Sequence, residues 1–390
     1  MKKNIWNIFF FILGCFFTIC CYKIYKITNN KYKEKILIID KEYSLKERGF
    51  CFCKDIQSDI SIDKLNEISL RNLDNGQSYV DIASIYNVDE QKKLMQELYN
   101  QTKNITAMVS NDNNIWITSD IHGDIRMLME GLLKSGLITW NGNTKIEEYS
   151  AYNNQIYKVI YPDVQINNRF KGKYINLGDI VNKHSFGIHC LYLMHDIFEK
   201  TKNKNGNNDK IKIIIGNHEY ADINLPIFSD YSPYKNSLLK FIDMFDVYYE
   251  DKYLSFTHAP MSPGLQPKDQ DEIAKLKKQI DNDKDFKVQH ILWGAGDKYL
   301  NTLKAIFILQ KPNKIKPCNV SGHTHGSIDF GYNKRKDVLN VSTDRFNKDL
   351  SKRGIIFRIN KTNMEVYSYT KKKGEIIENK LNKDFYNKCR

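Results

Sequence analysis

Short apolar runs alternate with polar and helical stretches from about residue 113 onward. Five runs rich in Ile, Val, Tyr or Phe end at glycine or polar residues: Ile115–Thr118, Tyr174–Leu177, Ile211–Ile215, Tyr253–Thr257 and Cys318–Ser321. Runs of this length and composition are typical of buried strands. The segment Met127–Leu137 has helical spacing and contains Gly136 near its end. Strands that alternate with helical segments predict an α/β layered domain.

The regions around this pattern divide the chain further. A helical pattern at Asp89–Tyr99 lies within a polar stretch that we interpret as a spacer or accessory helical region. A segment rich in Tyr and Asn at residues 140–173 predicts a strand-rich insertion, and Gly354–Tyr369 predicts two closing strands. The predicted boundaries are an N-terminal segment at 1–30, the polar region at 31–112, the α/β domain at 113–372 and a basic C-terminal tail at 373–390.

The N-terminal segment contains one long apolar run, Ile5–Tyr22. At about 1.5 Å per residue its length is roughly 27 Å, enough for a transmembrane helix. The lysines that follow it favour a cytoplasmic position for the rest of the chain. We therefore expect a membrane-anchored protein with one N-terminal span. Three alternatives stay open: a cleaved signal peptide, a lipoprotein modified at Cys15 in Ile12-Leu13-Gly14-Cys15, and a buried core helix.

Composition indicates an ordinary folded protein, because 41% of the 390 residues are hydrophobic. The net charge of +13 is spread along the chain without a compact block of basic and aromatic residues, so nucleic-acid binding is not expected. The eight cysteines form no disulfide framework. Cys51 and Cys53 form an isolated pair, a poor zinc signal.

Each of the five apolar runs is followed by residues that bind metals. In chain order they are Ser119-Asp120-Ile121-His122-Gly123-Asp124, Gly178-Asp179, Gly216-Asn217-His218-Glu219, His258 and Gly322-His323-Thr324-His325-Gly326. Ligands of open α/β sheets lie outside the carboxyl ends of the strands, so we expect these loops to converge. Their mixture of carboxylates, imidazoles and an amide suits Mn²⁺, Fe²⁺ or Zn²⁺ better than Ca²⁺.

These blocks resemble the calcineurin-like metallophosphoesterase superfamily, whose motifs are GDxHG, GDxxDR, GNH(D/E), H and GHxH. The resemblance spans about Ile115 to Ser342 and is strongest to the phosphoprotein (Ser/Thr) phosphatase branch and its bacterial relatives, through Gly123-Asp124 and Glu219. It implies a layered β-sandwich flanked by helices.

The resemblance also implies a role for each matching residue. The first metal ion would be bound by Asp120, His122 and His325, the second by Asn217, His258 and His323, and both by Asp179. Two such ions share a hydroxide that attacks phosphorus. His218 would protonate the leaving oxygen, so His218 and Asp179 are the predicted catalytic residues.

The second block departs from the family pattern, since it reads Gly178-Asp179-Ile180-Val181-Asn182-Lys183. Asn182 stands where the family has a carboxylate that orients the acid histidine. Lys183 replaces an arginine and keeps the charge without the bidentate fork. We predict Lys183, His184 and Asn217 as substrate-binding residues.

Three functions are compatible with these residues. The first is hydrolysis of phosphate monoesters, on phosphoproteins or small phosphoesters. The second is hydrolysis of phosphodiesters or nucleotide polyphosphates. Two features favour it: the loss of the family's phosphate-binding arginines, at Lys183 and in Tyr220-Ala221-Asp222 after Glu219, and the His-Thr-His ending. The third is a membrane-tethered binding protein that keeps its metals without catalysing hydrolysis.

Overall fold

The computed structural model describes chiefly residues 86–150, 156–181, 183–224, 240–251, 254–260, 318–323, 338–340, 354–362, 365–372 and 374–380, with a few isolated positions elsewhere. The chain divides into two compact units, residues 1–57 and 58–390, and every described residue belongs to the second. The predicted membrane anchor therefore lies outside the described residues. Within the described part, no helix is both long and apolar enough to cross a bilayer.

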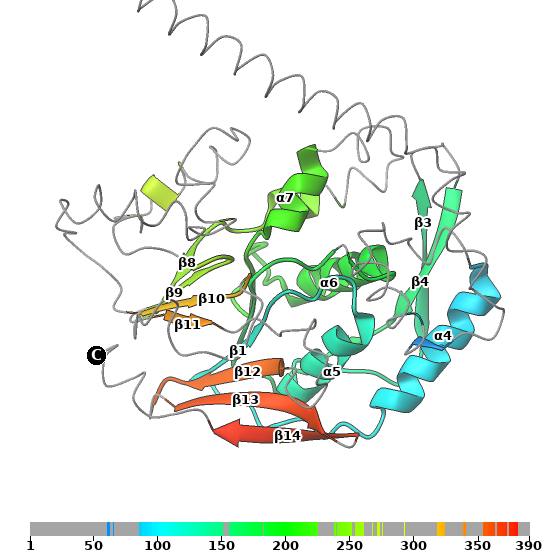
Figure 1. Ribbon diagram of the computed structural model, residues 1–390, viewed down its shortest axis with the longest axis horizontal. Coiled ribbons are helices and arrows are strands. Elements are labelled where there is room, and N and C mark those ends of the chain that lie inside the picture. The colour runs from blue at the N-terminus through cyan, green and yellow to red at the C-terminus, as the bar shows by residue number, and fades with distance from the viewer. Residues whose placement is uncertain are drawn as a thin grey trace, which may run out of the picture. The chain divides into compact units, whose positions relative to one another are not determined.

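A mixed six-stranded sheet forms the centre of the fold, in the order β14-β13-β12-β1-β6-β7 (Figure 1). Its strands are β1 (Asn114–Thr118), β6 (Lys173–Asn176), β7 (Ile211–Ile213), β12 (Gly354–Asn360), β13 (Glu365–Lys372) and β14 (Glu375–Lys380). Strands β1, β6 and β7 are parallel, whereas β12, β13 and β14 pair antiparallel. All five residues of β1 are buried, so both faces of the sheet are covered there.

A second sheet has the order β11-β10-β9-β8, with β9, β10 and β11 parallel. Its strands are β8 (Tyr249–Glu250), β9 (Leu254–Thr257), β10 (Cys318–Ser321) and β11 (Val338–Asn340). Ile115 and Ile117 of β1 share one hydrophobic core with Leu254 and Phe256 of β9 and Val320 of β10. The two sheets therefore form the two layers of a sandwich around a common core.

Helix α5 (Ile125–Ser135) packs against β1 and β12 of the first sheet, and α6 (Gly187–Thr201) packs beside α5. The short α7 (Asn217–Asn224) follows β7 in the chain. Asp124 caps α5 by accepting a 3.0 Å hydrogen bond from the Met127 backbone, and Gly136 ends the helix with φ at 75°. At Gly131 the helix lies so close to β1 that a Cβ would be 3.3 Å from Thr118 Cγ2. The Asp124 cap therefore fixes the start of α5 directly after the first of the five predicted metal-binding loops.

An accessory module packs beside α5 and α6. It consists of α4 (Val88–Thr102) and a hairpin of β3 (Thr144–Ser150) and β4 (Ile156–Pro162), near the short pair β2 (Ile138–Thr139) and β5 (Gln165–Ile166). Asn87 and Glu90 form a capping box at the start of α4. Gln91 is buried, and its side chain joins α4 to β4 and to His189 of α6.

The predicted secondary structure is largely confirmed. The five apolar runs are β1, β6, β7, β9 and β10, and residues 140–173 contain β3, β4 and β5. The predicted helix begins two residues earlier than expected, at Ile125, because Asp124 is its cap. The two closing strands are β12 and β13, and a third, β14, lies in the segment predicted as a basic tail. Its charged side chains pair across strands, as Glu378 does with Arg358. The segment therefore lacks the hydrophobic pattern from which a strand is predicted.

Candidate metal centre

The turns that follow β1 and β6 are bonded to each other along their backbones. Asp120 donates its N–H to Gly178 O at 3.0 Å, and His122 donates to Asp179 O at 2.6 Å. Gly123 continues this ladder to Ile180 O at 2.7 Å. The two turns therefore present Asp120, His122 and Asp179 from one rigid unit.

Left-handed backbone marks the same turns. In the described part of the chain, five residues other than glycine have positive φ: Asp120 at 52°, His122 at 50°, Asp179 at 56°, Lys183 at 69° and His323 at 64°. Each such residue costs about 1–3 kcal/mol and persists only where the surroundings impose it. All five are residues that the sequence predicted for the site. The backbone strain is therefore concentrated at the residues whose side chains form the predicted site.

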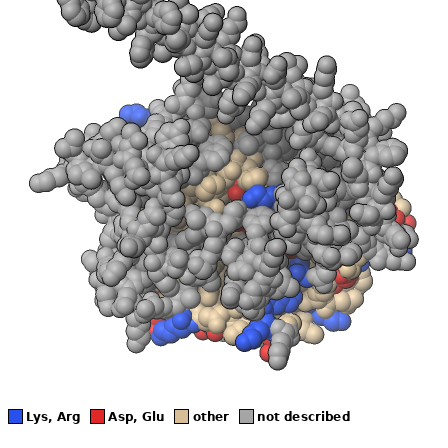
Figure 2. Space-filling model, viewed as in Figure 1, with Lys and Arg blue, Asp and Glu red and all other residues tan. Residues whose placement is uncertain are grey.

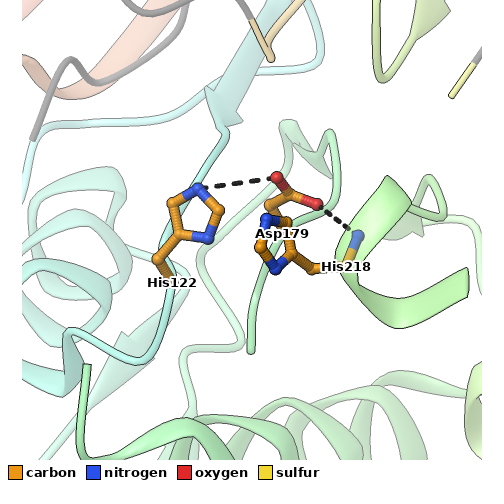
Figure 3. Close-up of side chains that lie close together, drawn as sticks. All are labelled: His122, Asp179 and His218. Carbon is orange, nitrogen blue, oxygen red and sulfur yellow. Dashed lines mark hydrogen bonds and ion pairs between the residues drawn. The ribbon is translucent and has the colours of Figure 1, made fainter. Parts of the chain in front are cut away.

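His122, Asp179 and His218 form a first cluster of possible metal ligands (Figure 3). Their ligand atoms lie within 4.8 Å of one another. His122 Nε2 is 3.5 Å from Asp179 Oδ2 and 3.9 Å from Asp120 Oδ1. His122 Nδ1 lies 3.4 Å from the Val181 carbonyl, an arrangement that leaves the Nε2 lone pair facing the carboxylates.

Asp179, His258 and His323 form a second cluster, which Asn217 completes. Asn217 Oδ1 is 2.9 Å from His258 Nε2 and 3.0 Å from His323 Nδ1. His258 Nδ1 lies 2.6 Å from the Leu177 carbonyl, so this nitrogen donates the proton and Nε2 is free to bind a metal. Three potential ligand atoms from three separate strand ends thus meet at one point.

Asp179 belongs to both clusters. Its Oδ2 faces His122, and its Oδ1 lies 3.5 Å from His258 Nε2. Oδ1 also accepts the backbone N–H of His218 at 3.0 Å (Figure 3). Burial and the nearby Asp120 carboxylate raise the pKa of Asp179 well above its usual value. Two positive ions would remove this cost, because each oxygen faces one cluster.

Lys183 already places a positive charge among these groups. Its Nζ lies 2.9 Å from His122 Nε2. Burial lowers the pKa of Lys183, while Asp179 and Asp120 act in the opposite direction. On the face drawn in Figure 2, basic and acidic side chains of the described residues are visible side by side near the middle.

Burial also shifts the pKa values of two histidines of the site. Burial and, to a smaller extent, the charge of Lys183 lower the pKa of His218 to about 3. Burial also lowers the pKa of His258. Both rings are therefore neutral near pH 7, the form that binds metals. Carboxylates, neutral imidazoles and an amide oxygen in two clusters fit a pair of divalent transition-metal ions.

The remaining predicted residues take different positions. His184 is completely buried, and its backbone N–H donates to His122 O at 2.8 Å. His325 and Asn182 lie outside the described residues. Asp120 Oδ2 accepts the backbone N–H of His323 at 3.0 Å, which ties the first strand end to the last. These placements leave the predicted roles of His184 and His325 as predictions.

Two contributors were not predicted as site residues from the sequence. Ser119 donates its hydroxyl to Asp120 Oδ2, and a Cβ at Gly322 would lie 1.7 Å from that hydroxyl. Glu219 is fully buried and accepts backbone hydrogen bonds from the turns after β6 and β7. Burial and Asp179 raise the pKa of Glu219 to about 7. Only the position of Glu219 within the Gly-Asn-His-Glu block pointed to it.

Comparisons with known proteins give one family and several solved structures of low similarity. The model of the calcineurin-like phosphoesterase family matches residues 114–327, more than half of the chain. A cold-active protein tyrosine phosphatase is 14% identical, over 72% of this chain and 82% of that one, with a TM-score of 0.45. A metallophosphoesterase from Sphaerobacter thermophilus is 15% identical, over 70% and 89%, with a TM-score of 0.35. The comparison with curated proteins finds no match.

Proposed function

Because the chain belongs to the calcineurin-like phosphoesterases, a family of hydrolases, we propose that it hydrolyses phosphate monoesters with the help of two divalent metal ions. The observation that carries the proposal is the position of Asp179. Its two oxygens face two separate groups of histidines, each 3.5 Å away at the nearest nitrogen. A carboxylate placed in this way is suited to bridge two cations.

The residues would divide into two ligand sets. Asp120, His122 and Asp179 would hold one ion, with His325 as the predicted further ligand. Asn217, His258, His323 and Asp179 would hold the other. When bound, two such ions activate water as a nucleophile and neutralise charge on the phosphoryl oxygens. Mn²⁺, Fe²⁺ and Zn²⁺ all suit this donor set.

Two basic side chains would act on the substrate. Lys183 offers an ammonium group beside His122, and a cation there favours a dianionic monoester over a monoanionic diester. His218 lies beside Asp179 and would donate a proton to the leaving oxygen. A bound phosphate dianion raises the low pKa of His218, because negative charge favours the imidazolium form. Phosphoserine, phosphothreonine and small phosphoesters would all present such a dianion.

The proposal is tested with the full-length protein, purified in detergent and loaded with Mn²⁺. Hydrolysis of an aryl phosphate monoester is compared with hydrolysis of the matching diester, for wild type, Asp179→Asn and His218→Ala. We expect the monoester to be preferred, Asp179→Asn to lose activity, and His218→Ala to lose less of it because an aryl leaving oxygen needs little protonation. Preference for the diester would instead support the second candidate function. Two bound metals without turnover of either ester would overturn hydrolysis in favour of a binding role.

We further propose that the apolar N-terminal run, Ile5–Tyr22, anchors the enzyme in a membrane with its hydrolase domain on the cytoplasmic side. Alkaline extraction of membranes tests the anchor. Wild type is expected in the pellet, and a protein that starts at Asn30 is expected in the supernatant. Recovery of wild type in the supernatant would contradict it, and a mass shortened to begin at Cys15 would support lipidation instead.

A further inference from the structure

Glu219 joins the turns that carry the two groups of ligands. It lies in the first turn of α7 and is fully buried. Its Oε2 accepts the backbone N–H groups of Asp179 at 2.8 Å and Gly216 at 3.0 Å. Its Oε1 accepts those of Ile180 at 2.6 Å and Val181 at 3.1 Å. We infer that Glu219 is a positioning residue that fixes Asp179 between the two metal clusters.

The packing around these bonds leaves the two turns no other arrangement. A Cβ at Gly216 would lie 2.3 Å from Asp179 N and 2.3 Å from Asp179 Oδ1. The turn after β7 therefore touches the backbone and the side chain of Asp179 directly. Because Glu219 is completely buried, water cannot replace its oxygens as acceptors. Loss of these acceptors would leave up to four buried N–H groups without partners.

The geometry requires a carboxylate rather than an amide. Each oxygen of Glu219 faces a pair of N–H donors, so neither position tolerates an NH₂ group. Glutamine has almost the same volume, yet in either orientation it places its NH₂ against two donors. Glu219→Gln thus removes two hydrogen bonds and adds repulsion without opening a cavity. The left-handed backbone of Asp179, at φ 56°, would then lose the contacts that impose it.

Gln91 offers a matched control in a region away from the metal clusters. It is also buried and also makes four hydrogen bonds: its Nε2 donates to Tyr86 O and Lys158 O, and its Oε1 accepts from Ile160 N and faces His189 Nε2. Gln91→Glu is the mirror-image change, because it places an acceptor against two carbonyl oxygens. It should destabilise the fold for the same reason without touching the turns that carry ligands.

The inference rests on the proposed two-metal site, so the test has one readout that needs the metal and one that does not. Mn²⁺ affinity of the full-length protein is measured by titration calorimetry. Hydrogen–deuterium exchange of the peptide that contains residues 178–181 is measured on metal-free protein. The proteins are wild type, Glu219→Gln, Glu219→Asp and Gln91→Glu.

We expect Glu219→Gln to weaken Mn²⁺ binding by about tenfold or more and to speed exchange in residues 178–181. Glu219→Asp should keep part of the wild-type Mn²⁺ affinity and part of the wild-type protection from exchange. Gln91→Glu should leave both the affinity and the exchange unchanged while it lowers the melting temperature. If Glu219→Gln does not fold, Glu219→Asp carries the test through a smaller change in the same direction.

Wild-type affinity and exchange in a folded Glu219→Gln protein would overturn the inference and leave the proposed function standing. Equal weakening by Gln91→Glu would also overturn it, because the effect would then be one of general stability. A wild type that binds no Mn²⁺ would overturn the proposed function together with the inference.

Discussion

Two regions of the molecule each contain a buried polar side chain with four hydrogen bonds. One region is the metal-site turns, which follow β1, β6, β7, β9 and β10. The other is the accessory module of α4, β3 and β4. In the metal-site turns Glu219 accepts all four bonds and lies among left-handed residues such as Asp179. In the accessory module Gln91 both donates and accepts, between elements of regular backbone. The same requirement for partners thus supports backbone strain in one region and ordinary packing in the other.

The largest effect that would sharpen this contrast is expected from Asp179→Asn. Removal of the bridging charge should lower kcat on the order of 10³-fold or more, about 4 kcal/mol. Without metal the same change should stabilise the fold, because the raised pKa shows that the buried carboxylate is unfavourable there. Activity is measured with Mn²⁺, and unfolding is measured with denaturant in a chelator. A metal-free variant less stable than wild type would contradict this account of the strain.

His218→Ala should give the next largest effect, and its size should depend on the leaving group. A general acid typically contributes about 10²–10⁴-fold when the leaving oxygen is basic, and much less when it is not. We therefore expect a large loss with an alkyl phosphate and a small one with an aryl phosphate that has an acidic phenol. Equal losses with both substrates would show that His218 serves as a ligand or a structural residue, which its place in the first cluster also permits.

Gln91→Met should affect stability alone. The change keeps the length of the side chain but removes the partner of the Tyr86 and Lys158 carbonyls and of the buried Ile160 N–H. We expect a loss of about 2–4 kcal/mol in unfolding free energy. Chemical denaturation measures this loss, and kcat/KM for the monoester should stay at the wild-type value once the protein is folded. A fall in kcat/KM would show that the accessory module and the metal-site turns are coupled.

Lys183→Met should have a smaller effect that falls on substrate binding. The change removes the ammonium group beside His122 while keeping a long side chain. We expect KM for the monoester to rise about tenfold, close to 1.4 kcal/mol, with less change for the diester because it carries one charge fewer. Lys183→Arg is the control and should recover most of the loss. Equal effects on both esters would argue against a role in recognising the dianion.

The smallest effect concerns His189, the partner of Gln91. Burial lowers the pKa of His189 to about 3 in the folded protein, against about 6.5 when unfolded. The unfolded chain then takes up a proton that the folded one excludes, so this contribution is complete above pH 6.5 and is lost as pH falls toward 3. Between pH 6.5 and 5.5 the loss is about 1 kcal/mol.

Denaturation of metal-free wild type and His189→Gln at these two pH values measures the difference. The variant should lack this part of the pH dependence, since glutamine does not titrate. Parallel pH profiles for the two proteins would contradict the assignment to His189.

The sequence predicted the strands and the ligand-bearing loops because both are local signals. Ile115–Thr118 and the other four predicted strands are apolar runs bounded by turns, and the turn residues are the predicted metal ligands. Edge strand β14 was missed because most of its residues are polar or charged, among them Glu375 and Glu378. A strand whose stability comes from cross-strand pairs leaves little hydrophobic pattern to detect.

The supporting contacts of the site could not be predicted, because they join residues far apart in the chain. Glu219 bonds to the N–H of Asp179, 40 positions earlier, and nothing in the local sequence specifies that partner. Gln91 and His189 are 98 positions apart and have no motif in common. The left-handed φ of Asp120 and His323 is likewise imposed by tertiary contacts and not by residue type.

The hydrogen bond from His323 to Asp120 joins residues 203 positions apart, and it bears on how the protein is made. Closing so long a loop carries an entropic cost that is repaid only after both sheets have formed. During synthesis, β1 and β6 leave the ribosome well before β10, so the first cluster can be assembled while the second still lacks His323. Metal loading is therefore expected to finish as a late, post-translational step, after the last part of the second sheet has been released.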